Sequence, residues 1–160
     1  MKSAGKKYLK IIFFLSLIGI ILSSYLLNLH YIDAKKPCDI NDTLSCSKVS
    51  QSIYSELFGI PVSLLGIFGY LWLGLLSMAI YNGWDVKFNL QRYSKKVLAA
   101  ITVSALLFSL YLTYTEFFLI KAFCILCLFS QAVILVIVWC AYKYLKIDKH
   151  LKIDKQTEMM

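Results

Sequence analysis

Four long apolar stretches, separated by shorter polar segments, dominate the pattern of this chain. Uncharged apolar residues fill positions 11–29, 57–84, 97–115 and 122–142. A helix needs roughly 20 apolar residues to cross the hydrocarbon core of a bilayer, because each residue rises about 1.5 Å and the core is about 30 Å thick. The pattern therefore predicts an all-α integral membrane protein, a single domain (1–160) built as a bundle of four transmembrane helices. We expect these helices at about 11–29, 59–82, 97–115 and 122–142.

Helices are favoured over strands because lipid offers no partner for backbone polar groups, and a barrel would show short stretches of alternating polarity. That alternation is absent from the sequence. The first stretch follows a lysine-rich start, as in a signal peptide. Its apolar run is long, however, and no A-x-A-like cleavage site precedes the next loop, so we expect a retained helix.

The connections between the stretches predict further features. The loop 30–56 is the longest, and its residues Val49 and Ile53, followed by Leu57, are spaced for a short amphipathic helix on the membrane surface. Glu116 and Lys121 are expected to mark a tight turn between the third and fourth helices. Residues 143–160 form a lysine-rich tail that is typical of a solvated or lipid-associated end.

Glycine and proline in the second stretch indicate how its helix begins and packs. The helix is expected to start near Pro61, and Gly66, Gly69 and Gly74 predict close approach to a neighbouring helix. Three aromatic residues near the predicted inner ends are interpreted as interfacial anchors. They are Tyr81, Trp84 and Trp139.

The charge distribution sets the orientation. The net charge is +8, from 17 basic and 9 acidic residues, and 13 of the basic residues lie in the start of the chain, the second connection and the tail. Because basic residues concentrate on the cytoplasmic side, both termini are expected in the cytoplasm and the loop 30–56 outside. A nucleic-acid partner is not expected, because the positive charge follows the loops and not a soluble basic face.

Four of the five cysteines then fall on the outer side. Cys38 and Cys46 lie in the outer loop, and Cys124 and Cys127 lie at the outer start of the fourth helix. That side faces an oxidising compartment, either outside the bacterial inner membrane or in the lumen of the endoplasmic reticulum. Cys140 lies 13 residues beyond Cys127, roughly 20 Å along the helix, and is expected to pack in the core.

The C-x-x-C pair is well placed for redox chemistry. Residues three apart on a helix share a face, so a Cys124–Cys127 disulfide needs only modest adjustment. A helix start favours a thiolate, which is the form that attacks disulfides. Three other interpretations remain. Cys124 and Cys127 could be plain packing residues, Cys38 and Cys46 could form a static disulfide that fixes the outer loop, or the four cysteines could bind zinc. Zinc is disfavoured because Cys₄ sites usually have two tight C-x₂₋₄-C pairs, whereas this chain has one, and no metal is expected.

The order of these residues resembles the vitamin K epoxide reductase family and its bacterial thiol-oxidase homologues. The resemblance rests on Cys38, seven residues, Cys46, then Ser52, and the late pair Cys124 and Cys127. Ser47-Lys48-Val49 after Cys46 also fits, and the likeness extends from the first helix to the end of the fourth.

The resemblance implies a membrane thiol-disulfide oxidoreductase that supports disulfide bond formation. A separate thioredoxin-like (DsbA-like) partner would give electrons to Cys38, Cys46 would pass them to Cys124, and Cys127 would lie beside a quinone. The quinone would be of the ubiquinone, menaquinone or vitamin K type. A DsbA-like oxidant has a reduction potential near −120 mV, whereas glutathione pools lie at about −180 mV or lower. A soluble thiol–disulfide couple therefore cannot re-oxidise the reduced partner, which requires a stronger oxidant such as a quinone.

Candidate quinone contacts also follow from the resemblance. Ser52 would be a polar contact near the pocket. Val62 stands where the family often has an asparagine, and Gln131 stands where some members have a tyrosine. The alternatives are a DsbB-like quinone reductase, in which the order of the two cysteine pairs is reversed, and a non-catalytic membrane scaffold with structural disulfides.

Overall fold

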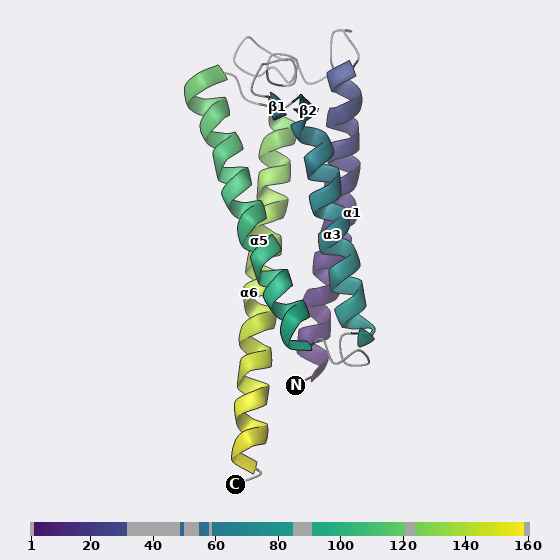
Figure 1. Cartoon of the computed structure of the whole chain (residues 1–160), viewed down its shortest axis with the longest axis vertical. Coiled ribbons are helices and arrows are strands. Elements are labelled where there is room, and N and C mark those ends of the chain that lie inside the picture. Colours follow the sequence, from purple (N-terminus) through teal and green to yellow (C-terminus); the bar gives the residue numbers. More distant parts are fainter. Residues whose placement is uncertain are drawn as a thin grey trace.

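Four helices lie side by side in the computed structural model of the chain, which describes residues 2–31, 49, 55–57, 59–84, 91–120 and 124–158 (Figure 1). They are α1 (Lys2–Tyr31), α3 (Val62–Tyr81), α5 (Gln91–Tyr114) and α6 (Ile125–Glu158). A π-helical segment, η2 (Thr115–Ile120), follows α5 directly. All four helices are long and apolar enough to cross a membrane, so the predicted all-α integral membrane bundle is confirmed.

Three helices are longer than the apolar pattern predicts, since α5 begins at Gln91, six residues before the expected start. The helix α1 begins at Lys2, so the lysine-rich start is helical, and α6 continues through the tail as far as Glu158. The tail contains neither glycine nor proline, and its lysines and leucines are good helix formers, so nothing in it ends the helix. Both termini lie at the same end of the bundle, and the C-terminal part of α6 projects beyond it (Figure 1).

A very short hairpin, which the apolar pattern does not reveal, lies at the opposite end of the bundle (Figure 1). Its strands β1 (Glu56–Leu57) and β2 (Ile60–Pro61) are antiparallel. Gly59 in the turn has φ +77°, a backbone conformation that residues with a side chain rarely adopt. Pro61 then precedes the first residue of α3, as predicted, because its fixed φ suits a helix start. The predicted outer-loop helix lies mostly outside the described residues.

Small residues bring α1 and α3 close together. A Cβ atom placed on Gly66 would lie 2.8 Å from Ser23 Oγ, and one on Gly74 would lie 3.4 Å from Ser16 Cβ. The prediction that glycines of this helix pack closely is therefore confirmed for these two positions, whereas Gly69 has no such neighbour within 4 Å. Close packing matters here because helices in lipid gain little from burying apolar surface against one another.

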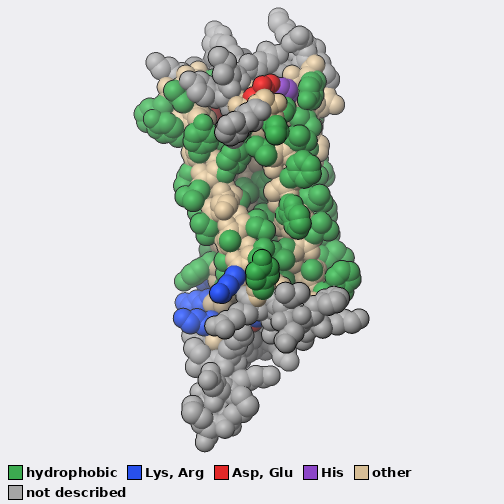
Figure 2. Space-filling model, in the orientation of Figure 1, with side chains coloured by type: hydrophobic (Ala, Val, Ile, Leu, Met, Phe, Trp, Pro, Cys, Tyr) green, Lys and Arg blue, Asp and Glu red, His purple; other side chains and the backbone are tan. Residues whose placement is uncertain are grey.

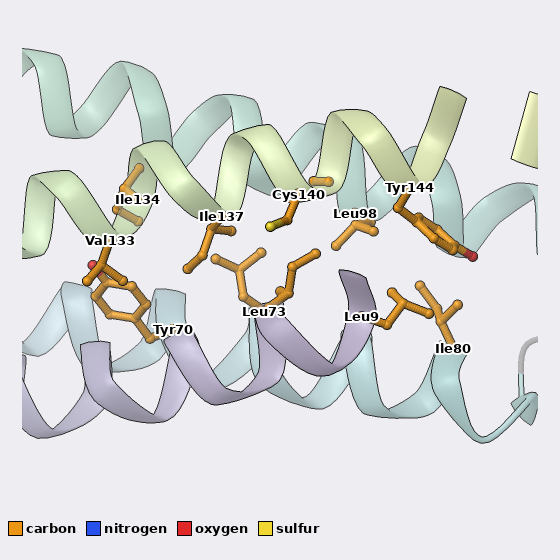
Figure 3. Packing of buried hydrophobic residues seen from close by; sticks show 12 residues of the cluster. Leu9, Tyr70, Leu73, Ile80, Leu98, Val133, Ile134, Ile137, Cys140 and Tyr144 are labelled. Atoms are coloured by element: carbon orange, nitrogen blue, oxygen red, sulfur yellow. The ribbon is translucent and has the colours of Figure 1, made fainter. Parts of the chain in front are cut away.

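The helix α6 packs against both α1 and α5, so it closes the bundle. Figure 3 shows the resulting core, in which side chains from all four helices meet. Leu73 and Ile137 are 1% exposed, and Cys140 lies among them, also 1% exposed, as expected for a packing cysteine. Lys95 donates a hydrogen bond to Asp148 and joins α5 to α6 near the end that carries the termini.

Several hydroxyl groups in the bundle donate to a carbonyl group of their own helix. Ser16 donates to the carbonyl of Ile12 at 2.8 Å, and Thr102 donates to the carbonyl of Leu98 at 2.6 Å. Such bonds to the preceding turn are the usual solution where no water is at hand. They allow these serines and threonines to lie inside the bundle without a partner from another helix.

The lateral surface is largely apolar, as a lipid-facing surface should be. Figure 2 shows hydrophobic side chains over the middle of the bundle, with acidic and histidine side chains at one end and basic ones at the other. At the end with the termini, Lys6 and Lys10 lie over the ring of Tyr81. Trp84 and Trp139 are 61% and 54% exposed. These positions suit the predicted interfacial anchors.

We predict that Gly19→Ala destabilises the bundle. A Cβ atom at this position would lie 2.4 Å from the ring of Tyr70 on α3, so this buried ring would have to shift away from α1. Overpacking of this kind costs about 1–3 kcal/mol. Thermal unfolding in detergent micelles would measure the change, with Gly69→Ala as the matched helical control. Equal stability of the two variants would contradict the prediction.

Candidate redox site at the start of the last helix

Cys124 and Cys127 lie together at the start of α6, at the end of the bundle that carries the hairpin (Figure 1). The carbonyl of Cys124 accepts the N–H of Leu128 at 3.0 Å, which is the first turn of the helix. Cys124 therefore occupies the N-cap position, where a side chain normally accepts hydrogen bonds from the first backbone N–H groups. Its sulfur takes this role, with donors from the backbone of Leu126 and Cys127.

The thiol of Cys127 completes the arrangement. A hydrogen bond from this thiol to the sulfur of Cys124 lowers the pKa of Cys124 below its ordinary value, and the backbone donors act in the same direction. Two smaller effects raise the pKa of Cys124. One is burial of this side chain, and the other is the nearby carboxyl group of Glu116. A lowered pKa increases the thiolate fraction, so Cys124 is the sulfur of the reduced pair that is more readily held as a thiolate.

Glu116 adds a carboxyl group to the same site, which the sequence did not predict. It forms hydrogen bonds with the Cys127 thiol and with the backbone N–H of Cys124. The expectation that Glu116 marks the turn before the last helix is wrong, because the chain continues from Tyr114 into the π-helical segment η2, where Glu116 is only 4% exposed. A π-helical segment shifts the helical register and is frequent at functional sites.

A cavity of about 210 Å³ lies beside the cysteine pair, inside the membrane-spanning part of the bundle. A single water needs a cavity of only about 10–15 Å³, so this cavity can admit a larger molecule. Its wall is mainly apolar and is contributed by all four helices. Lining residues include Leu26 of α1, Val62 and Leu73 of α3, Phe108 and Leu112 of α5, and Ile134 of α6.

A few polar groups interrupt this apolar wall. Ser109 of α5 donates a hydrogen bond to the side-chain carbonyl of Gln131 on α6. The hydroxyl groups of Tyr70 and Ser130 are 2.8 Å apart and link α3 to α6. Mainly apolar walls with a small number of placed polar groups are typical of sites for small molecules.

Contacts at the hairpin end of the bundle flank the cysteine pair. Nε2 of His30, at the end of α1, lies 3.3 Å from a carboxylate oxygen of Glu56 in β1. Val49 is buried against Cys124, with Leu26 and Ile120 packed around them. These apolar side chains therefore pack beside the pair, which also lines the cavity.

The structure thus brings together four of the residues that the sequence singled out. Cys124, Cys127, Val62 and Gln131 all line the cavity. Cys38, Cys46 and Ser52 lie outside the described residues. Glu116 was the residue missed, and the signal for it was an ionisable side chain within an otherwise apolar membrane stretch, eight positions before Cys124.

Comparison with known protein families agrees with this site. A family model described as the vitamin K epoxide reductase family matches residues 10–142. The match runs from α1 to the part of α6 beyond Cys140, and it includes both cysteine pairs, the cavity and Glu116. The resemblance seen in the cysteine spacing is thereby confirmed. This chain, an integral membrane protein with a cysteine pair beside an apolar cavity, belongs to the vitamin K epoxide reductase family of oxidoreductases.

Proposed function

We propose that this protein re-oxidises a thioredoxin-like partner and passes the electrons through two cysteine pairs to a membrane quinone. The observation that carries the proposal is the Cys124–Cys127 pair at the start of a membrane helix, beside an apolar cavity within the bundle. The net reaction converts a partner dithiol and a quinone into a partner disulfide and a quinol. The protein's own redox groups are sulfurs, so the quinone is the terminal electron acceptor.

The relay begins in the outer loop. A thiolate of the partner attacks Cys38 of a Cys38–Cys46 disulfide, which releases Cys46 as a thiolate. The second thiol of the partner then attacks its own sulfur in the mixed disulfide, which forms the partner disulfide and releases Cys38. Cys46 attacks Cys124 of an oxidised Cys124–Cys127 pair and releases Cys127. Cys38 finally attacks Cys46, which re-forms the Cys38–Cys46 disulfide and releases Cys124 as a thiolate. Hydrogen bonds from the Leu126 and Cys127 backbone favour negative charge on the sulfur of Cys124, so the reduced pair is stabilised with Cys124 as thiolate.

The cavity supports a quinone as the acceptor. Its apolar wall suits a ring that arrives from the lipid, and its polar groups can orient the ring oxygens. Ser109 holds the carbonyl oxygen of Gln131, which directs the amide N–H groups of that side chain to other acceptors. We propose Gln131 as the donor to a quinone oxygen, Val62 as an apolar contact, and Ser52 as a further polar contact from the outer loop.

The alternatives are less well supported. In a DsbB-like enzyme the C-x-x-C pair precedes the separated pair, whereas here it follows. A scaffold with structural disulfides would not require a cysteine at the N-cap with a lowered pKa beside a cavity. The charge pattern supports a bacterial inner-membrane protein with both termini cytoplasmic and the cysteine pairs on the outer side.

The orientation can be tested by chemical labelling. Variants that keep a single cysteine at position 38 or 46 should react with a membrane-impermeant thiol reagent in intact cells, because basic residues retain the other ends of the helices inside. A variant that keeps only Cys140 is the control and should stay unlabelled. Labelling of Cys38 only after the inner face is opened would contradict the topology.

The role of the inner pair can be tested by substitution. Cys124→Ala or Cys127→Ala should reduce dithiol-driven quinone reduction to the background rate. Cys140→Ala should leave the rate within about twofold, since that residue is roughly 20 Å along the helix and packs in the core. Quinone absorbance would follow each reaction, and thermal unfolding would show that the variants fold. Loss of activity in a folded Cys140→Ala protein would contradict the assignment.

The direction of the relay within the outer loop can be tested by trapping. If the partner attacks Cys38, removal of Cys46 leaves no resolving sulfur, so Cys46→Ala should accumulate a covalent complex with the partner. Cys38→Ala should give no such complex. A non-reducing gel of each variant, expressed with a DsbA-like partner, separates the two results. A complex that forms with Cys38→Ala but not with Cys46→Ala would reverse the proposed order.

A further inference from the structure

Glu116 is a buried carboxyl group that the sulfur relay described above does not use. It lies in η2 within the membrane-spanning part of the chain and is 4% exposed. Among the basic side chains that the structure describes, none forms an ion pair with it. Burial of an ionisable group within a membrane protein is costly, so a structural role alone is a poor explanation for its presence.

The contacts of Glu116 point to a specific task. The single proton of the Cys127 thiol faces two acceptors, the sulfur of Cys124 and the carboxyl group of Glu116. If the proton of Cys127 moves to Cys124, the thiol and the thiolate of the pair merely change places. If it moves to Glu116, both sulfurs are thiolates and can give up electrons. The backbone N–H of Cys124 donates to the same carboxyl group and holds it in this position.

Two other titratable side chains that line the cavity interact with partners other than the cysteine pair. The hydroxyl group of Tyr70, on α3, is hydrogen-bonded to Ser130, and His30, on α1, is paired with Glu56. Within the part of the chain that the structure describes, the remaining titratable groups that line the cavity are the two cysteines and Glu116. Glu116 is thus the carboxyl group in contact with the redox pair.

We propose that Glu116 accepts the proton of Cys127 when the Cys124–Cys127 pair is oxidised, and delivers it to an oxygen of the quinone in the cavity. This inference rests on the proposed function and assigns a catalytic proton carrier to it. The step forms one S–S bond, breaks the S–H bond of Cys127 and transfers two electrons to the quinone. The second proton of the quinol replaces the one that Cys124 lost as a thiolate, and it comes from the aqueous phase.

The test isolates the half-reaction that involves the inner pair. Pre-reduced protein in detergent micelles is mixed with a short-chain ubiquinone or menaquinone, and a single turnover is followed by quinone absorbance. Glu116→Gln keeps the size and a hydrogen-bonding side chain but cannot accept the proton, so the rate should fall by about 10²-fold or more. Glu116→Asp should retain part of the rate. Glu158→Gln, the same change at the far end of α6, should match the wild type.

The pH profile provides a second measure. In Glu116→Gln the proton of Cys127 must leave to hydroxide, so its oxidation rate should rise steeply with pH. The wild-type rate should change less over the same range, because the carboxyl group is already in place. Exchange between an added dithiol and the loop cysteines does not use Glu116 and should be equal in the two proteins. A Glu116→Gln rate within about threefold of the wild type, with an unchanged pH profile, would overturn the inference.

A spectroscopic measure separates proton transfer from structural support, and its first part uses the wild-type protein alone. The infrared difference spectrum between the reduced and oxidised wild-type protein during quinone turnover should contain a band of a protonated carboxyl group that shifts in D₂O. Absence of the band in Glu116→Gln supports the assignment to this residue. If Glu116→Gln fails to fold and the wild type shows no such band, the role is structural and the inference falls. If the wild type reduces no quinone, the proposed function itself fails.

Discussion

A bilayer offers no water to a polar group, and this constraint shapes the whole bundle. Serines and threonines of the helices donate to carbonyl groups of their own preceding turn, as Ser16, Ser77 and Thr102 do. Polar side chains that are not satisfied in this way are gathered around one cavity. The Tyr70–Ser130 and Ser109–Gln131 contacts join different helices there, and they give an otherwise apolar space its directional groups.

The same constraint makes the start of α6 chemically special. The first backbone N–H groups of a helix have no partner within the helix, and near lipid they must find one elsewhere. Here the sulfur of Cys124 accepts from them, so a structural requirement of the helix end also favours the thiolate. A serine at this N-cap would satisfy the same donors, but it could not exchange a disulfide.

Family membership and local geometry answer different questions about this protein. The match over residues 10–142 establishes a membrane oxidoreductase of the vitamin K epoxide reductase family. The geometry adds how the inner pair is arranged, with Cys124 buried, Cys127 between it and Glu116, and the cavity alongside. Val62 and Gln131 both lie in the cavity wall, where the proposed quinone would bind.

The sequence by itself determined the four spans, because about 20 consecutive apolar residues have few other solutions in a bilayer. It also determined the family, because the spacing of Cys38, Cys46, Cys124 and Cys127 is carried by the residues themselves. The helix ends were less predictable, since the charged residues at the start of α1 and in the tail are also good helix formers.

The position of Glu116 was decided only by the tertiary structure. Its neighbours in the chain suggested a tight turn between two helices, but the π-helical segment η2 places it against Cys127. The cavity was likewise invisible in the sequence, because its wall combines residues from four separate helices. Local spacing reveals which residues share one helix face, whereas the meeting of several faces depends on how small residues such as Gly66 and Gly74 allow the helices to approach.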